Sequence, residues 1–233
     1  MRLLSIAIFI SSPLLLAQEP IVNQSQWETE LIQKALQNIE QALQKRGAIP
    51  APGGRELIIP DPQALYSRVR ALFPAGVLRP YASGRIPRGG IQFSGQVEVP
   101  VEKTDRGRVV ELVHFEIAVY PAGADARRRM AEQLTVQAMF LEGSLQPPEV
   151  GELAYHYPPQ DGTHDAHIVF IRNTVVVKLG WSGPVFIRNP EEDEDYMGPP
   201  ELVHMDLHVR QKCQQLAVDI DHVLQEMLRF PDR

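Results

Sequence analysis

Apolar residues recur at helical spacing in two long stretches, one toward each end of the chain. In residues 25–47 the apolar positions are Trp27, Leu31, Ile32, Ala35, Leu36, Ile39, Ala42 and Leu43. In residues 200–228 they are Met205, Val209, Cys213, Leu216, Ile220, Val223 and Met227. Steps of three and four place such residues on one face of an α-helix. We therefore predict two long amphipathic helices, with Cys213 buried on the apolar face of the second.

In the middle of the chain the pattern changes to a period of two. Four segments there are predicted to form two hairpins, residues 91–101 with 108–120 and residues 166–171 with 174–179. A two-residue turn, Arg172-Asn173, joins the second pair, and asparagine tolerates the left-handed backbone of such turns. In the first pair, Val113, Phe115 and Ile117 alternate with other residues, which is typical of a sheet with one face in the core.

Shorter elements are predicted between these segments. Asp61-Pro62 has the pattern of an N-cap followed by proline, so a helix is expected over residues 61–73. A second helix is expected over 125–141 and a short strand over 150–157, whereas residues 77–90, rich in Gly, Pro and Arg, are expected to be mostly loop. Hairpins clustered between helices indicate an α+β fold, with an antiparallel sheet packed against helices.

The first residues have the pattern of an export signal. Arg2 supplies a positive charge, residues 3–16 are mostly apolar, and Ala17 is a small residue at the expected cut. At roughly 1.5 Å per residue the apolar run reaches about 21 Å, less than the ~30 Å hydrocarbon core of a bilayer. We predict a cleavable signal peptide and a secreted or periplasmic protein with no transmembrane segment after cleavage. An uncleaved N-terminal anchor is the alternative.

These patterns predict four parts: a signal peptide (1–17), a helical arm (18–47), a linker (48–60) and a single α+β domain with a long C-terminal helix (61–233). The arm is expected to dock on its own domain. The alternative is a homo-oligomer paired through residues 25–47.

Composition narrows the classes of partner. Asp and Glu number 29 against 23 Lys and Arg, a formal net charge of −6, which argues against nucleic-acid binding. The single cysteine excludes an intramolecular disulfide. Five arginines without an acidic neighbour occur within residues 62–97: Arg68, Arg70, Arg79, Arg85 and Arg88. If they converge, an anionic envelope component is the expected partner. Pairing with acidic residues inside the protein, or simple solvation, is the alternative.

Histidines supply the candidate metal ligands. His204 and His208 have the i, i+4 spacing that places two imidazoles on one helix face, and His164 and His167 are further candidates. A solvated helix flank is the simpler interpretation, and no cofactor is predicted. Residues 180–184 come close to a serine-hydrolase elbow, but the last position is Pro184 and a strand-like run follows. We interpret them as a turn leaving the second hairpin.

The order of elements over residues 113–179 carries one resemblance. A strand, a helix, the segment Val-Gly-Glu-Leu-Ala-Tyr and a hairpin at 168–177 resemble small extracytoplasmic α+β modules of bacterial exported proteins and sensor ectodomains. Their hairpins often carry Phe-x-Arg-Gly-Asn-x-Val-Val-Val, whereas here Arg172-Asn173 follow directly without the glycine. The resemblance implies a binding or interaction module of the envelope, and it assigns no functional residue.

We therefore expect an exported, non-catalytic module that binds an envelope protein or an anionic envelope component. The rival hypothesis is an exported hydrolase, metal-assisted through the four histidines.

Overall fold

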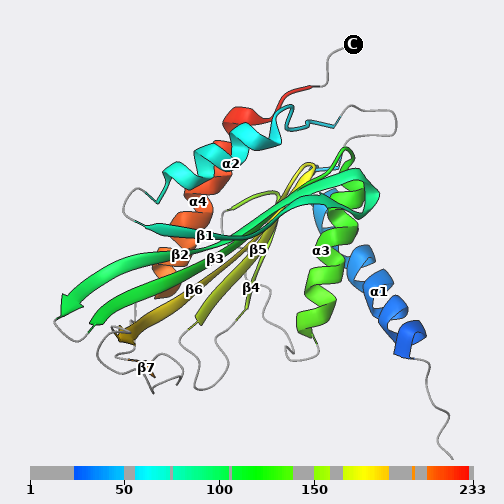
Figure 1. Cartoon of the computed structure of the whole chain (residues 1–233). Helices are drawn as coiled ribbons and strands as arrows, with labels where there is room; N and C mark the ends of the chain where they lie inside the picture. Colours follow the sequence, from blue (N-terminus) through cyan, green and yellow to red (C-terminus); the bar gives the residue numbers. More distant parts are fainter. Residues whose placement is uncertain are drawn as a thin grey trace, which may run out of the picture.

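The computed structural model describes residues 24–49, 56–73, 76–104, 107–138, 150–157, 165–188, 201–202 and 209–230. Within these ranges the chain forms four α-helices, one short 3-10 helix and seven strands (Figure 1). The helices are α1 (Gln24–Lys45), α2 (Pro62–Ala71), η1 (Pro87–Gly89), α3 (Gly123–Ala138) and α4 (Val209–Met227). The strands are β1 (Val77–Ile86), β2 (Gly90–Thr104), β3 (Gly107–Val119), β4 (Leu153–Tyr157), β5 (Asp165–Arg172), β6 (Val175–Arg188) and β7 (Glu201–Leu202). The predicted signal peptide lies outside the described residues.

All strand pairs are antiparallel, and they form one sheet in the order β1-β2-β3-β6-β5-β4, with β7 added to β6. The long hairpin of β2 and β3 is continuous with the hairpin of β5 and β6, because β3 pairs with β6. The predicted α+β fold with an antiparallel sheet is confirmed.

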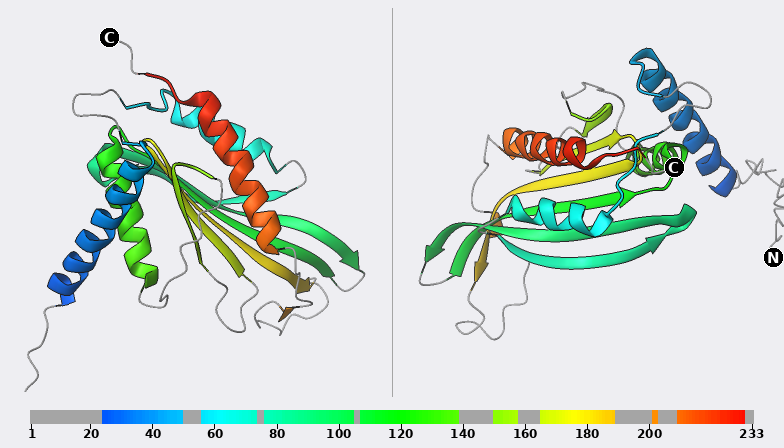
Figure 2. Two further views of the ribbon diagram at one scale, coloured as in Figure 1. Left: turned by 180° about the vertical axis from the view of Figure 1, so that it is seen from behind. Right: turned by 90° about the horizontal axis from the view of Figure 1, so that it is seen from above.

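Helices lie against both faces of this sheet (Figure 2). The larger core cluster joins one face of the sheet to α2 and α4, and the smaller cluster joins the other face to α1 and α3. The two faces of β3 show the predicted period of two. Val113, Phe115 and Ile117 belong to the larger cluster, whereas Ala118 belongs to the smaller one.

The amphipathic pattern of α1 is satisfied within the chain, since the helix packs against α3. Ile39 and Leu43 are buried between the two helices and the sheet, and Arg127 of α3 lies 3.8 Å from the carboxylate of Glu40. Burying an Ile or Leu side chain stabilises a fold by about 1.5–3 kcal/mol. Docking therefore gives a sufficient reason for the apolar stripe, although Trp27 at the start of the helix remains 39% exposed.

The α2 helix begins as its sequence predicts. Asp61 is the N-cap, and its carboxylate accepts hydrogen bonds of 3.0 Å from the backbone N–H groups of Gln63 and Ala64. Such a cap supplies partners for N–H groups that no helical carbonyl reaches. The helix buries Leu65 against the sheet, and the ring of Tyr66 stacks on that of Phe93 in β2 at 5.1 Å.

The predicted loop over residues 77–90 is wrong, because residues 77–86 form strand β1, which pairs with β2 over its whole length. β1 is an edge strand, and its register shifts between Pro80 and Ala82. A proline lacks a backbone N–H, which disfavours it in central strands but not at an edge or a bulge. Residues 77–86 therefore form a strand despite their Gly- and Pro-rich composition, because their backbone groups pair with those of β2.

Two details of the second hairpin also differ from prediction. The turn consists of Asn173 and Thr174 rather than Arg172 and Asn173, since Arg172 pairs with Val175 and Asn173 holds the positive φ of 50°. Residues 180–184 are not a turn but part of β6. There Gly183-Pro184 form a bulge opposite Glu111, where a proline costs no ladder hydrogen bond.

The C-terminal helix is confirmed but starts later than residue 200. Glu201-Leu202 pair with β6 as β7, and α4 begins at Val209. Residues 203–208 lie outside the described ranges. Cys213 is fully buried, as predicted, and burial raises the pKa of its thiol to about 12.

The last part of the predicted linker takes part in the core. Ile59 is buried in the larger cluster beside α4. Ile58 and Arg229 form an antiparallel bridge, with N–H to carbonyl distances of 2.8 and 2.9 Å. This bridge joins the segment before α2 to the residues that follow α4.

Candidate ligand-binding cavity

On the sheet face that carries α1 and α3, the side chains change from apolar to mostly polar along the strands. In its helix-covered half the outward residues are apolar and buried with α3: Ala118, Val169, Ile171 and Val176. Further along the same strands lies the polar half, which we define by His114 and Glu116 of β3, His167 of β5, and Lys178 and Ser182 of β6. These side chains line a cavity of about 430 Å³ together with Ser94, Gly95, Phe115 and Gly180.

Gly180 forms the floor of this cavity. Its register partners are His114 on one side and His167 on the other, so the two histidines flank it on neighbouring strands. A Cβ at residue 180 would lie 2.7 Å from Nδ1 of His167 and 3.9 Å from Cβ of His114. The His167 imidazole therefore occupies the space that a side chain at residue 180 would need.

The two charged groups of the cavity lie directly opposite each other, since Glu116 pairs in register with Lys178. The Glu116 carboxylate accepts hydrogen bonds from Arg129 at 2.7 Å and from Gln133 at 2.6 Å. Lys178 is half-buried, and among the described residues it makes neither a hydrogen bond nor an ion pair. The acid is thus satisfied by α3, while no described residue accepts a hydrogen bond from the Lys178 ammonium group.

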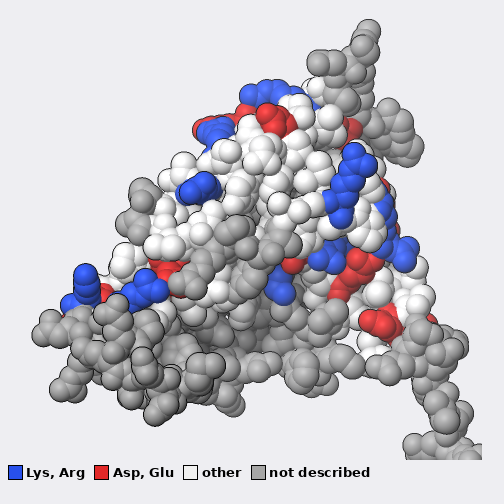
Figure 3. All heavy atoms as spheres, in the orientation of Figure 1, with Lys and Arg blue, Asp and Glu red and all other residues white. Residues whose placement is uncertain are grey.

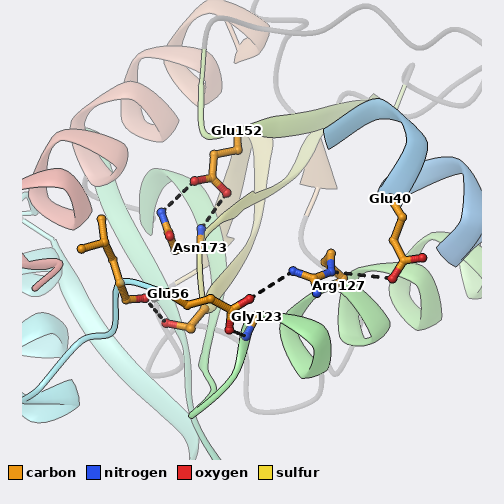
Figure 4. Close-up of polar contacts among 8 residues, drawn as sticks. Glu40, Glu56, Gly123, Arg127, Glu152 and Asn173 are labelled. Carbon is orange, nitrogen blue, oxygen red and sulfur yellow. Dashed lines mark hydrogen bonds and ion pairs between the residues drawn. The ribbon is translucent and has the colours of Figure 1, made fainter. Parts of the chain in front are cut away.

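Arg127 and Arg129, two of the three consecutive arginines of α3, tie this helix to other elements. Arg127 reaches Glu56 at 3.4 Å as well as Glu40, and the carboxylate of Glu56 also accepts the backbone N–H of Gly123 at 2.6 Å (Figure 4). An acid at this position satisfies a free N–H group and interacts favourably with the helix dipole. Arg128 lies 3.5 Å from Glu132, which leaves Arg129 as the arginine that reaches the cavity.

A second polar contact fixes the β5–β6 turn beside α1. The Glu152 carboxylate accepts hydrogen bonds from the backbone N–H of Asn173 at 2.8 Å and from its side-chain amide at 2.7 Å (Figure 4). Arg46 of the α1 end donates to the Glu152 carbonyl at 2.8 Å. Burial raises the pKa of Glu152.

The five arginines of the predicted anionic site do not come together. Arg68 pairs with Glu226 on α4, whereas Arg88 pairs with Glu132 on α3, so these two lie on opposite faces of the sheet. Arg70 lies on α2 and Arg85 is exposed on β1, while the side chain of Arg79 lies outside the described part. Figure 3 shows basic and acidic side chains interspersed on one face of the molecule.

Of the four candidate metal ligands only His167 is described, and it lines the cavity. His164, His204 and His208 lie outside the described residues. Within the described part of the chain, no group of three or more His, Cys, Asp or Glu side chains could hold a metal ion. Five consecutive acidic residues, 191–195, also lie outside the described ranges.

Another cavity, of about 310 Å³, lies between the end of α2 and α4 and is lined by Phe73, Val99, Trp181 and Leu216 among others. Its lysine is already engaged. Lys212 lies 2.6 Å from the buried carboxylate of Glu111, which also accepts the Trp181 indole N–H at 2.9 Å. The charges of Lys212 and Glu111 are therefore paired with each other rather than directed to a ligand.

The polar half was missed by sequence reasoning, although one local signal was available. Lys178, Gly180 and Ser182 interrupt at every second position a strand that is otherwise apolar, and His114 and Glu116 do the same in β3. Two strands with polar alternate positions indicate that one face of each leaves the core. That these positions face the same cavity depends on the pairing of β3 with β6.

No protein-family model, curated protein or solved structure matches this chain. Among the residues that the structure describes, no helix is long and apolar enough to cross a membrane.

Proposed function

We propose that the chain is an exported, non-catalytic binding module of the cell envelope or the extracellular space, and that the cavity above Gly180 is its ligand site. One observation carries the proposal: a sheet that is packed by helices on both faces holds, at the end of one face, a cavity of about 430 Å³ whose lining includes several polar and charged side chains. Small-molecule sites typically measure roughly 300–1,000 Å³ and contain a few placed polar groups.

The construction of the cavity favours binding. Its lining side chains come from four strands, β2, β3, β5 and β6, which are held in register by the sheet. Side chains on paired strands need little reordering when a ligand arrives, which lowers the entropic cost of binding. Ser182, the serine of the elbow-like segment, lies inside β6, whereas a nucleophile elbow needs a tight turn from strand to helix.

Export rests on the sequence of residues 1–17 and remains part of the proposal. It is tested by expressing the full chain in a bacterial host and locating the product by fractionation. A mature protein in the periplasm or medium, cut near Ala17, is expected. Full-length protein retained in the cytoplasm would contradict it.

The binding proposal is tested with a cavity-filling variant. Gly180→Val places a branched side chain where the His167 imidazole lies, whereas Gly84→Val adds the same side chain in β1, where nothing lies within 4 Å of a new Cβ. Both variants and the wild type are screened by thermal shift and ligand-detected NMR against a panel of soluble envelope sugars, sugar acids, sugar phosphates and peptides.

We expect at least one panel member to bind the wild type and Gly84→Val but not Gly180→Val, with circular dichroism showing that both variants are folded. Equal binding by Gly180→Val, or no binding by the wild type to any member, contradicts the proposal.

The rival function, a metal-assisted hydrolase, retains one supporting observation, namely that His167 lines the cavity. Metal analysis of the purified protein separates the two functions. Stoichiometric zinc that is lost in a His204→Ala/His208→Ala variant would favour the hydrolase, and protein without stoichiometric zinc would exclude it.

A further inference from the structure

We infer that the cavity above Gly180 takes an anionic oxyacid group, a phosphate or a carboxylate, with Lys178 as the residue that pairs with its charge. The inference rests on the proposed function, since it names the ligand class of that site. It uses none of the five arginines that the sequence suggested for an anionic partner.

The charged groups at the cavity are unevenly paired. Glu116 and Lys178 face each other across β3 and β6, yet the carboxylate is bound by Arg129 and Gln133 instead. The charges of Arg129 and Glu116 offset each other. Because Lys178 adds a further positive charge, the described groups at the cavity carry a net positive charge. An ammonium group has three donors and no acceptor, which means that an anion is its natural partner.

Lys178 is partly removed from solvent on a sheet surface, and within the described residues it forms no ion pair with a carboxylate. Partial burial of an unpaired charge is unfavourable, and a bound anion would remove that cost. A half-buried lysine at the edge of a cavity therefore favours an anion over a neutral ligand.

Two imidazoles lie near the ammonium group. Gly180 adds no side chain of its own, so the His167 imidazole lies against it, and His114 flanks it on the other strand. An imidazole carries at least one N–H donor whether it is neutral or charged. Ser182 adds a hydroxyl donor. The described lining thus contains N–H and O–H donors as well as the Lys178 ammonium group.

A cation is disfavoured by the same residues. Glu116 is the only carboxylate among the described lining residues, and its charge is already matched by Arg129. Lys178 would repel a metal ion or an ammonium ligand. The described lining accordingly lacks the three-ligand group that a metal site requires.

The test titrates isotopically labelled protein with four probes at constant ionic strength: sodium phosphate, sodium acetate, glucose and choline chloride. Three variants accompany the wild type, namely Lys178→Gln, Lys178→Arg and the matched control Lys103→Gln. Lys103 is an exposed lysine of β2 and is not part of the cavity lining.

We expect phosphate or acetate to shift the signals of residues around Gly180 in the wild type and in Lys103→Gln. Lys178→Gln should weaken that binding about tenfold or more, because one charged hydrogen bond is lost. Lys178→Arg should retain most of it. Equal binding by Lys178→Gln would overturn the inference.

The other outcomes separate the inference from the proposed function. If glucose or choline binds at Gly180 and the anions do not, the site is a ligand site but the inference is wrong. If no probe binds there and the broader panel also fails, the proposed function falls as well.

A final arm distinguishes the two sources of the anion. Glycerol 1-phosphate represents a soluble or polymer-borne phosphate, and phosphatidylglycerol vesicles represent a lipid headgroup, with phosphatidylcholine vesicles as the neutral control. Sedimentation with phosphatidylglycerol that depends on Lys178 would identify a lipid source. Binding to glycerol 1-phosphate alone would identify a soluble one.

Discussion

The helix-covered half and the polar half of one sheet face are built from the same strands, yet one is part of the core and the other lines a cavity. Under α3, Ala118 of β3 and Val176 of β6 are buried with Met130. Two residues further along each strand stand Glu116 and Lys178, at the edge of the cavity. Strand pairing is continuous through both halves. The sheet is the same platform in both halves, and the extent of α3 decides which part of it is core and which part lines the cavity.

The largest effect is expected from a truncation in the helix-covered half. Met130 is fully buried between α3 and the sheet, so Met130→Ala should lower the free energy of unfolding by about 2–5 kcal/mol. Urea denaturation measures this directly. A loss below about 1 kcal/mol would mean that α3 contributes little to the core and that the two halves differ less than their burial indicates.

An intermediate effect is expected at the boundary. Arg129→Ala removes one of the two donors to Glu116 and should cost about 1–2 kcal/mol. The freed carboxylate lies opposite Lys178 and competes for its ammonium group, so phosphate binding should also weaken. Arg128→Ala is the control, because this exposed arginine only shares Glu132 with Arg88 and its loss should cost about 0.5 kcal/mol or less. Unchanged phosphate affinity in Arg129→Ala would refute the coupling.

A smaller effect is expected from pH at the contact between Glu152 and Asn173, beside the helix-covered half. Burial raises the pKa of Glu152 above its ordinary value of about 4.3, so the folded protein holds this proton more tightly than the unfolded chain does. Its contribution to stability is therefore greatest below that ordinary pKa and is lost as pH rises through the raised one. Relative to Glu152→Gln, the wild type should gain stability as pH falls from 7 toward 4. A flat difference between the two unfolding curves would count against this assignment.

The smallest effect on stability is expected in the polar half. Lys178→Gln should change the free energy of unfolding by no more than about 0.5 kcal/mol, because Lys178 has no hydrogen bond or ion pair among the described residues. Thermal and urea denaturation measure it alongside Met130→Ala. A large loss would show that Lys178 supports the fold, and the contrast between the two halves would then disappear.

Much of the fold was predictable because its signals are local. Apolar residues at helical spacing located α1 and α4, the Asp61-Pro62 cap located α2, and alternation located β3. These patterns reflect which face of each element is buried, and that face can be recognised from residues close together in the sequence. β1 escaped detection because its Pro80 and Gly84 lower strand propensity, while its pairing comes from β2, a separate segment.

The candidate cavity could not be predicted in the same way. Its histidines come from β3 and β5 and its floor from β6, so they meet only through the strand order β3-β6-β5. The ion pairs are equally non-local, since Arg68 binds Glu226 and Arg88 binds Glu132. The positions of the arginines in the sequence do not indicate which carboxylates will lie near them. The described partners, Glu226 and Glu132, lie on α4 and α3.

The bridge between Ile58 and Arg229 has a consequence for the order of folding. It joins two segments separated by most of the length of the chain, and Ile59 beside it shares a core with Leu224 of the last helix. Contacts of such sequence separation slow folding, because a long loop must close before they form. During synthesis, α2 and the first hairpin emerge long before their partner helix exists. The larger core can be completed only after α4 has been made, so the earlier elements of that core wait for the helix that covers them.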